Sequence, residues 1–578
     1  MSGGKVLVRG NENSSLLTVV RSLGRKGIIV HVGMCGSCLP ATRSRYISKV
    51  HHIEITSDAR LCDIERVCSL LDQERYDLVI PCDDPSSIPL DAHRTRLNSY
   101  RNIYIQEKET YEITSNKFEI NKICRVLGIN LPRERLVTVN DNPEGIYSDF
   151  RPFVVLKPLS SFHSGSLDER RNVRKAYSYE TFLHILTEML KSGDVLVQED
   201  FLGTGIGVEC LAKGGKVLTA FQHQRVHEPL HGGGSSYRKS VPLDTRLLEA
   251  AEKLLGYLNY TGVAMLEFKK NLKTGDWTFM EINARFWGSL PLAVAAGIDF
   301  PYYLYEMLVK AKVEFNRIYR TNLYCRNLTR DVDWMIANIK ADKHNVRLNT
   351  KPVYACVLEV ANIIMLRERS DTLTCDDPIP GCIEIYQVLR SVLQRVITIV
   401  YLGLSDMLLS RRAMKRLMTS KIKHSKRILF VCKGNICRRP FAQMYATKRL
   451  HGYIDTLSAG TIQKQGRVSP NEAIDAASEF GIDLSGHASK PLTNEIICSS
   501  DVIVICDKEN VVHVVRNHPS ALHKTVLLGI YSDCPSTQIA DPFGKDKQEF
   551  LRTYCLIAKC IDGITGKSDG NHSGCVDL

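Results

Sequence analysis

The chain has 578 residues, a formal net charge of +13 and a hydrophobic fraction of 44%, as expected for a globular protein of roughly three to five domains. Its longest apolar run, near Val396 to Leu404, is far shorter than the roughly 20 residues that a membrane span requires, and its first residues show no secretory signal. The 19 cysteines follow no framework spacing, which argues against a disulfide scaffold and favours reduced thiols in the cytoplasm.

Residues 1–110 alternate strand-like and helix-like segments and predict an N-terminal α/β domain with a parallel sheet. The expected strands and the amphipathic helix lie at 5–10, 15–26, 28–33 and 76–82. The absence of a G-x-G-x-x-G motif argues against nicotinamide binding. Cys35 and Cys38 form a C-x-x-C without two further ligands at a suitable spacing, so we expect an ordinary loop there.

Residues 111–330 mix helices with strands and predict an α+β domain. Its strands are expected at 152–158, 194–200, 216–221, 263–270 and 277–283. A Lys-Thr-Gly-Asp turn separates the last two, which predicts an antiparallel hairpin.

Residues 331–425 carry no motif that we can connect with chemistry, and we assign them to a helical extension and a basic linker. Ile385 to Leu404 is apolar at helical spacing, and a basic stretch follows from Arg411 to Arg427. Contact with a membrane surface is one interpretation of such a segment. We favour a packed helix followed by a solvated linker.

Residues 426–567 return to βα alternation and predict a doubly wound parallel-sheet domain, followed by a disordered tail at 568–578. Within it, VCKGNICRRP contains C-x5-R, follows an apolar strand and opens a helix. Backbone N–H groups of such a loop and the helix N-terminus form an anion site. The expected phosphate-binding loop comprises Lys433, Gly434, Asn435, Ile436 and Cys437.

Three side chains around this loop suit phosphate-ester chemistry. Arg438 can bind two phosphate oxygens, and the same positive field favours the thiolate of Cys432 and depresses its pKa. Asp541, in ADPFGKD, can give a proton to the departing oxygen.

This segment closely resembles the low-molecular-weight protein tyrosine phosphatases over nearly its whole length, including GIDLSGHASKPLT at 481–493. The resemblance implies that Cys432 is the nucleophile that forms a phosphocysteine, Arg438 the phosphate clamp, and Asp541 the general acid and then the base, without a metal. It also suggests Cys437 as a reversible disulfide partner that protects Cys432.

Two loop positions bear on rate and substrate. The family has Ser after the arginine, whose hydroxyl hydrogen-bonds the thiolate, whereas this chain has Arg439. The charge of Arg439 still favours the thiolate, and we expect Ser at this position to raise the rate. Ile436 stands where arginine-phosphate phosphatases of the family carry Thr, which argues against phosphoarginine and leaves a phosphomonoester metabolite or a phosphotyrosine protein.

A second ordered set, between residues 111 and 300, suits ATP. One lysine ends the strand VVLKP before the loop SSFHSGS, another begins a helix, and VQEDFL is a candidate hinge whose backbone binds adenine. A glutamate in GVEC is a candidate ribose or magnesium-side carboxylate. In chain order the expected ATP contacts are Lys117, Lys157, Glu199, Phe201 and Glu209.

A metal site is expected on the hairpin. Glu281 and Asn283 are two residues apart on one strand and therefore share a face, and Glu267 faces them if the hairpin pairs as expected. Two carboxylates and an amide oxygen suit Mg²⁺, with Mn²⁺ as an alternative. Arg285 is then close enough to steady a transferring phosphoryl group.

The set resembles the ATP-grasp superfamily across residues 1–330, with the nearest likeness to carbamoyl-phosphate-synthase-like carboxylate–amine ligases. The run HQRVHEPLHGGGSSYRKSV matches their substrate loop, with Arg225, Gly233 and Ser235. The resemblance implies ATP-driven formation of an acyl phosphate, followed by attack of an amine. The loop after Lys157 has only Gly165, fewer glycines than the family usually shows.

The sequence therefore predicts a bifunctional cytoplasmic enzyme of biosynthesis, built from α/β and α+β domains. Its expected partners are a small carboxylate and amine and a phosphorylated substrate, and the positive charge is interpreted as suited to phosphate rather than to nucleic acid. The alternative is a regulatory phosphatase whose ATP-grasp half is inactive and senses a ligand.

Overall fold

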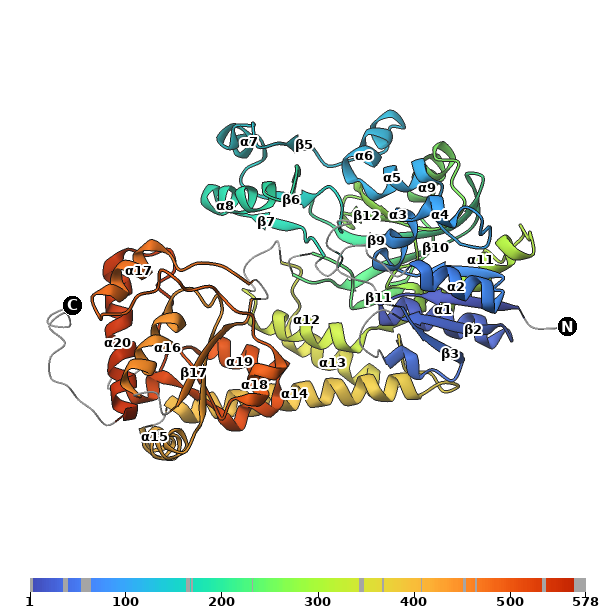
Figure 1. The fold of residues 1–578 in the computed structure, drawn as a ribbon. Helices are drawn as coiled ribbons and strands as arrows, with labels where there is room; N and C mark the ends of the chain where they lie inside the picture. The colour runs from blue at the N-terminus through green and yellow to red at the C-terminus, as the bar shows by residue number, and fades with distance from the viewer. Residues whose placement is uncertain are drawn as a thin grey trace. The chain divides into compact units, whose positions relative to one another are not determined.

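The computed structural model describes residues 4–34, 40–53, 64–162, 167, 170–230, 232–342, 348–365, 368–406, 408–450, 454–462, 465–532 and 537–565. The chain divides into two compact units, Met1–Val388 and Leu389–Leu578 (Figure 1). Cys35, Cys38, Gly165 and the tail at 568–578 lie outside the described residues. Among the described helices, none combines the length and the hydrophobicity needed to cross a membrane.

The first unit begins with the predicted parallel sheet, in the strand order β3-β2-β1-β4. The apolar face of α1 packs on it, with Leu16, Val19 and Val20 fully buried. The elements of this part are β1 (Lys5–Arg9), α1 (Asn13–Arg25), β2 (Ile29–Met34), a 3₁₀ turn (Pro40–Arg43), β3 (Ile47–His52), α2 (Ile64–Glu74), β4 (Leu78–Pro81), α3 (Asp84–Ala92) and α4 (Arg94–Leu97).

A small antiparallel sheet follows, in the order β5-β8-β6-β7. Its inner face packs on α7 and α8 through buried aliphatic and aromatic side chains such as Leu156, Val197 and Phe182. Its elements and the two preceding helices are α5 (Lys108–Ser115), α6 (Lys117–Val126), β5 (Glu134–Val137), α7 (Pro143–Phe150), β6 (Val154–Pro158), β7 (Arg174–Ala176), α8 (Tyr179–Leu190) and β8 (Val195–Glu199).

A larger sheet of seven strands completes the first unit, in the order β13-β12-β9-β10-β11-β14-β15. The predicted hairpin between β12 and β13 is confirmed. The strands are β9 (Thr204–Lys213), β10 (Lys216–His227), β11 (Tyr237–Ser240), β12 (Gly262–Lys270), β13 (Trp277–Asn283), β14 (Tyr324–Arg326) and β15 (Arg369–Ser370). The helices are α9 (Thr245–Tyr257), α10 (Leu290–Ala296), α11 (Phe300–Val309), α12 (Leu328–Lys340) and α13 (Val353–Ile364).

Within residues 331–425 we expected a packed helix followed by a solvated linker, and the structure differs on both points. The helix α14 (Ile379–Asp406) forms, but apolar side chains on it, including Tyr386, Leu389 and Leu393, are exposed. The basic stretch is largely helical as α15 (Leu408–Lys423), because Met418 and Ile422 are buried in the core of the second unit.

The second unit contains the predicted parallel sheet, in the order β17-β16-β18-β19. Helices α16, α17 and α20 pack together, with the rings of Phe441 and Tyr554 stacked at 4.0 Å (Figure 1). The remaining elements are β16 (Arg427–Cys432), α16 (Arg438–Arg449), β17 (Asp455–Gly460), α17 (Asn471–Ser478), α18 (Asn494–Ser499), β18 (Val502–Ile505), α19 (Lys508–Asn517), a 3₁₀ helix (Pro519–Lys524), β19 (Thr525–Leu527), a 3₁₀ turn (Leu528–Tyr531) and α20 (Lys547–Thr565).

Two candidate functional sites

The C-x5-R loop curls around the thiol of Cys432. Cys432 ends β16 and Arg438 begins α16, so the strand–loop–helix arrangement is as predicted. Asn435 has a φ of 52°, which asparagine tolerates better than most residues. This turn brings its backbone N–H to 3.2 Å from the sulfur of Cys432, while its side-chain amide donates to the carbonyl of Ser458.

Two residues that the sequence reasoning did not single out anchor this loop. Arg467 donates to the carbonyl of Gly434 at 2.6 Å, and the Nε2 atom of His487 lies 2.8 Å from the carbonyl oxygen of Asn435. His487 belongs to the segment GIDLSGHASKPLT, which carried the family resemblance. Both contacts hold the backbone of the loop in its curled form.

The guanidinium of Arg438 connects the thiol loop with Asp541, which lies 103 residues further along the chain. Its Nη2 atom donates to Asp541 at 2.6 Å, and its Nη1 atom donates to Asp507 and to the carbonyl of Ile539, each at 2.8 Å. Asp541 was predicted, whereas Asp507 was missed, although an acid at the carboxyl end of a parallel strand is a recognisable signal. The structure therefore places the predicted nucleophile loop, clamp and acid together.

The expected depression of the thiol pKa does not appear in this geometry. Burial raises the pKa of Cys432 above its ordinary value, against the opposing effects of Arg439, Arg438 and the Asn435 N–H. The thiol is only 4% exposed, and the charge of Arg438 is shared with two carboxylates. Burial also raises the pKa of Cys437 to about 12, so this second thiol is protonated at neutral pH.

Arg439 is fully buried beneath the loop. Its Nη1 atom donates to the carbonyl of Val504 at 2.6 Å, while Nε and Nη2 have no hydrogen-bond partner among the described residues. Among the groups that lower the pKa of Cys432, Arg439 has the largest effect. This placement reverses our expectation for Ser at position 439, because serine would remove the cation and leave its volume empty.

The first unit holds a cavity of about 510 Å³ that most of the second predicted set lines. Strands of the small antiparallel sheet and of the seven-stranded sheet, and the loop between β10 and β11, contribute to it. The predicted residues on its wall are Lys117, Lys157, Glu199, Phe201, Arg225, Gly233, Ser235, Glu267, Glu281, Asn283 and Arg285.

Glu267, Glu281 and Asn283, the predicted metal ligands on the hairpin, are paired as the sequence predicts. Glu267 lies directly opposite Glu281, and Met265 lies opposite Asn283, so the three polar side chains share one face. The amide nitrogen of Asn283 donates to Glu267 at 3.1 Å, which leaves its oxygen for a cation. Lys117 Nζ lies 3.6 Å from Glu281.

Lys157 gives the cavity a buried ammonium group at the end of β6. Burial lowers its pKa to about 8, and the neighbouring charge of Glu281 opposes this shift. The group is therefore still positive at neutral pH, as contact with phosphate requires.

The hinge residues Glu199 and Phe201 form hydrogen bonds with Arg133, which precedes β5, and with Lys269 of β12. The carboxylate of Glu199 accepts the backbone N–H of Arg133 at 2.9 Å, and the carbonyl of Phe201 accepts from Lys269 at 3.1 Å. Asp200, between them, lies 3.0 Å from Lys175 Nζ and also lines the cavity. The sequence reasoning missed this ion pair.

The substrate-loop arginine contacts the metal set. Arg225 donates to the carbonyl of Gly233 at 3.0 Å and forms an ion pair with Glu267. Glu228, in the same loop, accepts the backbone N–H of Gly205 at 2.7 Å. These bonds connect the loop both to β9 and to the carboxylate of Glu267 in β12.

Arg285 is fixed by a group from the N-terminal α/β part. Its guanidinium donates to both carboxylate oxygens of Asp84, at 2.7 and 2.8 Å. A second such pair, Arg330 Nη2 and Glu12 Oε1 at 2.9 Å, also lines the cavity. No local sequence signal marks Asp84, Glu12 or Arg330, because each comes from a segment outside the expected motifs.

Glu209 is the predicted contact that the structure does not bring to the cavity wall. Its side chain lies on the same face of the sheet as that of Glu267. However, Glu209 pairs with Met265, two residues before Glu267 on β12, and its side chain is fully buried. Its Oε1 atom accepts from Ser289 at 2.8 Å and lies 2.9 Å from Nδ1 of His223. Burial raises the pKa of Glu209 and lowers that of His223, which favours a neutral pair over a cation ligand.

These arrangements define two classes of domain, a ligase-type ATP-grasp domain and a cysteine-dependent tyrosine phosphatase domain. The family described as "Low molecular weight phosphotyrosine protein phosphatase" matches residues 427–567, and "ATP-grasp in the biosynthetic pathway with Ter operon" matches residues 191–329. Through its C-terminal part the chain belongs to the low-molecular-weight protein-tyrosine-phosphatase family.

Individual relatives match one part of the chain at a time. The phosphatase Etp of Escherichia coli K12 is 33% identical over 132 residues, which is 23% of this chain and 87% of the relative. The phosphatase Ptp of Acinetobacter johnsonii is 33% identical over 136 residues, 24% of this chain and 93% of the relative. The biotin carboxylase domain of Hydrogenobacter thermophilus 2-oxoglutarate carboxylase, solved with MgADP and bicarbonate, is 16% identical, with a TM-score of 0.45 over 56% of this chain and 74% of that one.

Proposed function

We propose that the chain is a bifunctional enzyme that joins a carboxylate to an amine at the expense of ATP and hydrolyses a phosphomonoester at a separate site. The observation that supports the ligase most directly is the convergence of Lys117, Lys157, Glu267, Glu281 and Asn283 on one cavity. The match to an ATP-grasp family supports the same assignment.

The donors on the hairpin fit a hard divalent cation. Two opposed carboxylates and an amide oxygen whose nitrogen is already engaged are ligands that Mg²⁺ prefers. Glu267, Glu281 and Asn283 would hold Mg²⁺, with Mn²⁺ as a substitute, and the ion would neutralise phosphate charge. For Glu267 to take this role, its ion pair with Arg225 must loosen, which frees the arginine for the substrate carboxylate.

The proposed ligase chemistry has two steps. A carboxylate oxygen attacks the γ-phosphorus of ATP, the bond to ADP breaks, and an acyl phosphate forms. The amine nitrogen then attacks the acyl carbon, inorganic phosphate leaves, and an amide results. Lys117 and Lys157 would bind phosphate oxygens, and their position on the cavity wall beside Arg285, which Asp84 holds, supports this role.

The proposed phosphatase chemistry uses Cys432, Arg438 and Asp541. The thiolate of Cys432 attacks phosphorus while Asp541 gives its proton to the leaving oxygen. Water then attacks the phosphocysteine, Asp541 takes a proton, and inorganic phosphate is released. The observation that supports this assignment is the 2.6 Å bond between Arg438 and Asp541 beside the thiol loop.

The test of the ligase is ADP release by the full chain during a screen of carboxylates and amines, repeated with Glu281→Gln. Substrate-dependent release that the variant loses supports the proposal. Substrate-dependent turnover that Glu281→Gln leaves at the wild-type rate contradicts the assignment.

A second function for the first unit is a ligand sensor without turnover. The ion pairs of Arg225 with Glu267 and of Arg285 with Asp84 favour it, because they occupy two groups that catalysis needs. ATP binding by wild type without ADP release for any substrate pair would select this function.

The two activities are further proposed to serve one biosynthetic route. Fusion keeps both sites at equal amounts and raises the effective concentration of a shared intermediate. Comparison of the phosphatase activity on phosphotyrosine peptides and on phosphorylated ligase products tests this. Efficient hydrolysis of peptides alone, with no phosphate on any ligase product, argues for a protein substrate instead.

A further inference from the structure

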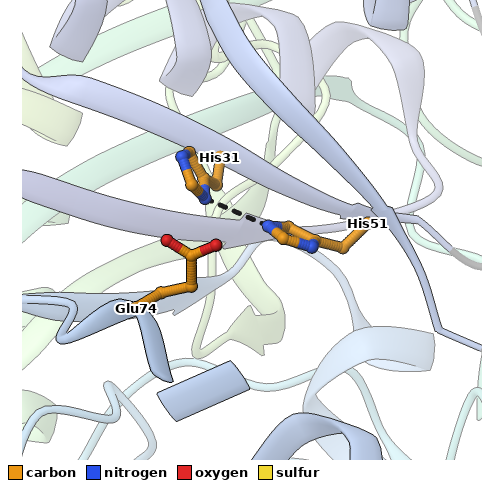
Figure 2. A group of neighbouring side chains, drawn as sticks. All are labelled: His31, His51 and Glu74. Carbon is orange, nitrogen blue, oxygen red and sulfur yellow. Dashed lines mark hydrogen bonds between the residues drawn. The ribbon is translucent and has the colours of Figure 1, made fainter. Parts of the chain in front are cut away.

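Two buried histidines and a glutamate meet at the edge of the N-terminal parallel sheet, and they belong to neither site described above. His31 lies in β2, His51 in the edge strand β3, and Glu74 ends α2 (Figure 2). The potential ligand atoms of these three residues all lie within 4.8 Å of one another. None of the three lines the 510 Å³ cavity of the ATP-grasp part.

The ring nitrogens converge on one point together with a phenol. His31 Nδ1 lies 3.0 Å from His51 Nε2, and the hydroxyl of Tyr76 lies 2.8 Å from the first and 3.2 Å from the second. Figure 2 shows the carboxylate of Glu74 facing the same pair of rings. Both imidazoles are about 5% exposed and lie beside an apolar cluster that includes Leu7 and Val67, so they need polar partners.

The spacing suits a small tetrahedral ion. Zinc bonds of about 2.0–2.1 Å place neighbouring tetrahedral ligand atoms roughly 3.4 Å apart. The imidazole nitrogens need to separate by only a few tenths of an ångström, whereas the Glu74 oxygen has to approach them. Imidazole nitrogen selects zinc and its neighbours in the transition series over Mg²⁺. The ligands would also come from three separate elements, which is typical of an ion that fastens a fold.

We propose that His31, His51 and Glu74 bind one divalent ion of the zinc class, with a water held by the Tyr76 hydroxyl as fourth ligand. The ion would fasten the edge strand β3 to β2 and to the end of α2. Its role is structural, since the ligands lie outside both catalytic assemblies.

Two lysines modulate this site. Lys49 Nζ lies 2.8 Å from one oxygen of Glu74, and Lys5 forms an ion pair with the other. A carboxylate has about four lone-pair positions, so it can accept both ammonium groups and still bind an ion. The two positive charges nevertheless oppose a dication, and we expect an affinity that a strong chelator overcomes.

The test is Zn²⁺ titration of the chelator-treated, reduced full chain by calorimetry, in excess Mg²⁺ to occupy the hard-ligand site. His51→Gln is compared with His52→Gln, because His52 is exposed and belongs to the same strand. The wild type and His52→Gln are expected to bind one equivalent more than His51→Gln. Zn²⁺ is also expected to raise the Tm of the wild type and of His52→Gln only.

Equal stoichiometry in the wild type and a folded His51→Gln would overturn the proposal and leave a hydrogen-bonded cluster of two imidazoles and a phenol. If His51→Gln does not fold, Glu74→Gln takes its place, because Glu74 is partly exposed. The expected result is then a loss of at least about tenfold in Zn²⁺ affinity and a changed absorption spectrum of bound Co²⁺. An unchanged affinity and spectrum would equally overturn it.

Discussion

Replacement of Arg439 by methionine isolates the effect of a buried cation on the catalytic thiol. Methionine keeps much of the length of the side chain and removes the charge and the bond to the Val504 carbonyl. Arg438 divides its charge between Asp507 and Asp541, so Arg439 supplies the larger uncompensated field at the sulfur. We therefore expect the pKa of Cys432 to rise further in Arg439→Met.

The size of this effect follows from Coulomb's law. At an effective dielectric constant of about 20, unit charges near contact interact by up to about 4 kcal/mol. One pKa unit corresponds to about 1.4 kcal/mol, so the expected rise is about one to three units. The thiolate population at pH 6 then falls roughly tenfold to thousandfold, and activity follows it.

The assay is the rate of alkylation of Cys432 by iodoacetamide as a function of pH, with Cys432→Ser as the background. The acid limb of the profile is expected to move to higher pH in Arg439→Met and to stay near that of the wild type in Arg439→Lys, which keeps the charge. Arg439→Ser is expected to lower the rate of aryl phosphate hydrolysis and the Tm. Superimposable alkylation profiles for the wild type and a folded Arg439→Met would show that the charge of Arg439 does not lower the pKa of Cys432.

Further predictions concern both sites. Asp541→Asn is expected to slow hydrolysis of aryl phosphates with poor leaving groups by about 10²–10⁴, and an unaltered rate would exclude it as the acid. Glu281→Gln is expected to abolish substrate-dependent ADP release, measured by a coupled assay, because one of two opposed carboxylates is lost. For Lys157, whose pKa is lowered to about 8, the KM for ATP is expected to rise as pH increases above that value and the ammonium loses its proton. A KM for ATP that is constant from pH 7 to 9.5 would show that Lys157 does not contact phosphate in its charged form.

Local pattern was sufficient for many of the elements and for the residues that share a predicted strand or loop, but not for α15 or β9. The spacing of Cys432 and Arg438 around one tight turn determined their meeting, and the hairpin determined that Glu267 faces Glu281. Period-two alternation determines which face a strand residue occupies, but not how deep it lies along that face. No strand was predicted around Glu209, which was expected to contact ATP but lies in β9 and is not among the residues that line the cavity.

Contacts between segments that are far apart in the chain could not be predicted from the sequence. Glu12 precedes α1 and Asp84 begins α3, and both form ion pairs with arginines much further along the chain that no spacing rule connects with them. Asp507 and His487 belong to recognisable segments, yet their partners in the thiol loop depend on tertiary packing. The pKa of Cys432 depended on the same packing, since burial outweighs the cationic field that the motif predicts.

Hydrolysis of an aryl phosphate by the full chain in excess chelator tests the central claim about the cysteine site most directly. We expect an undiminished rate in chelator for the wild type and no turnover above background for Cys432→Ser, because the thiolate is the proposed nucleophile and the proposed mechanism uses no metal. Activity that survives in Cys432→Ser, or that chelator abolishes in the wild type, would contradict it.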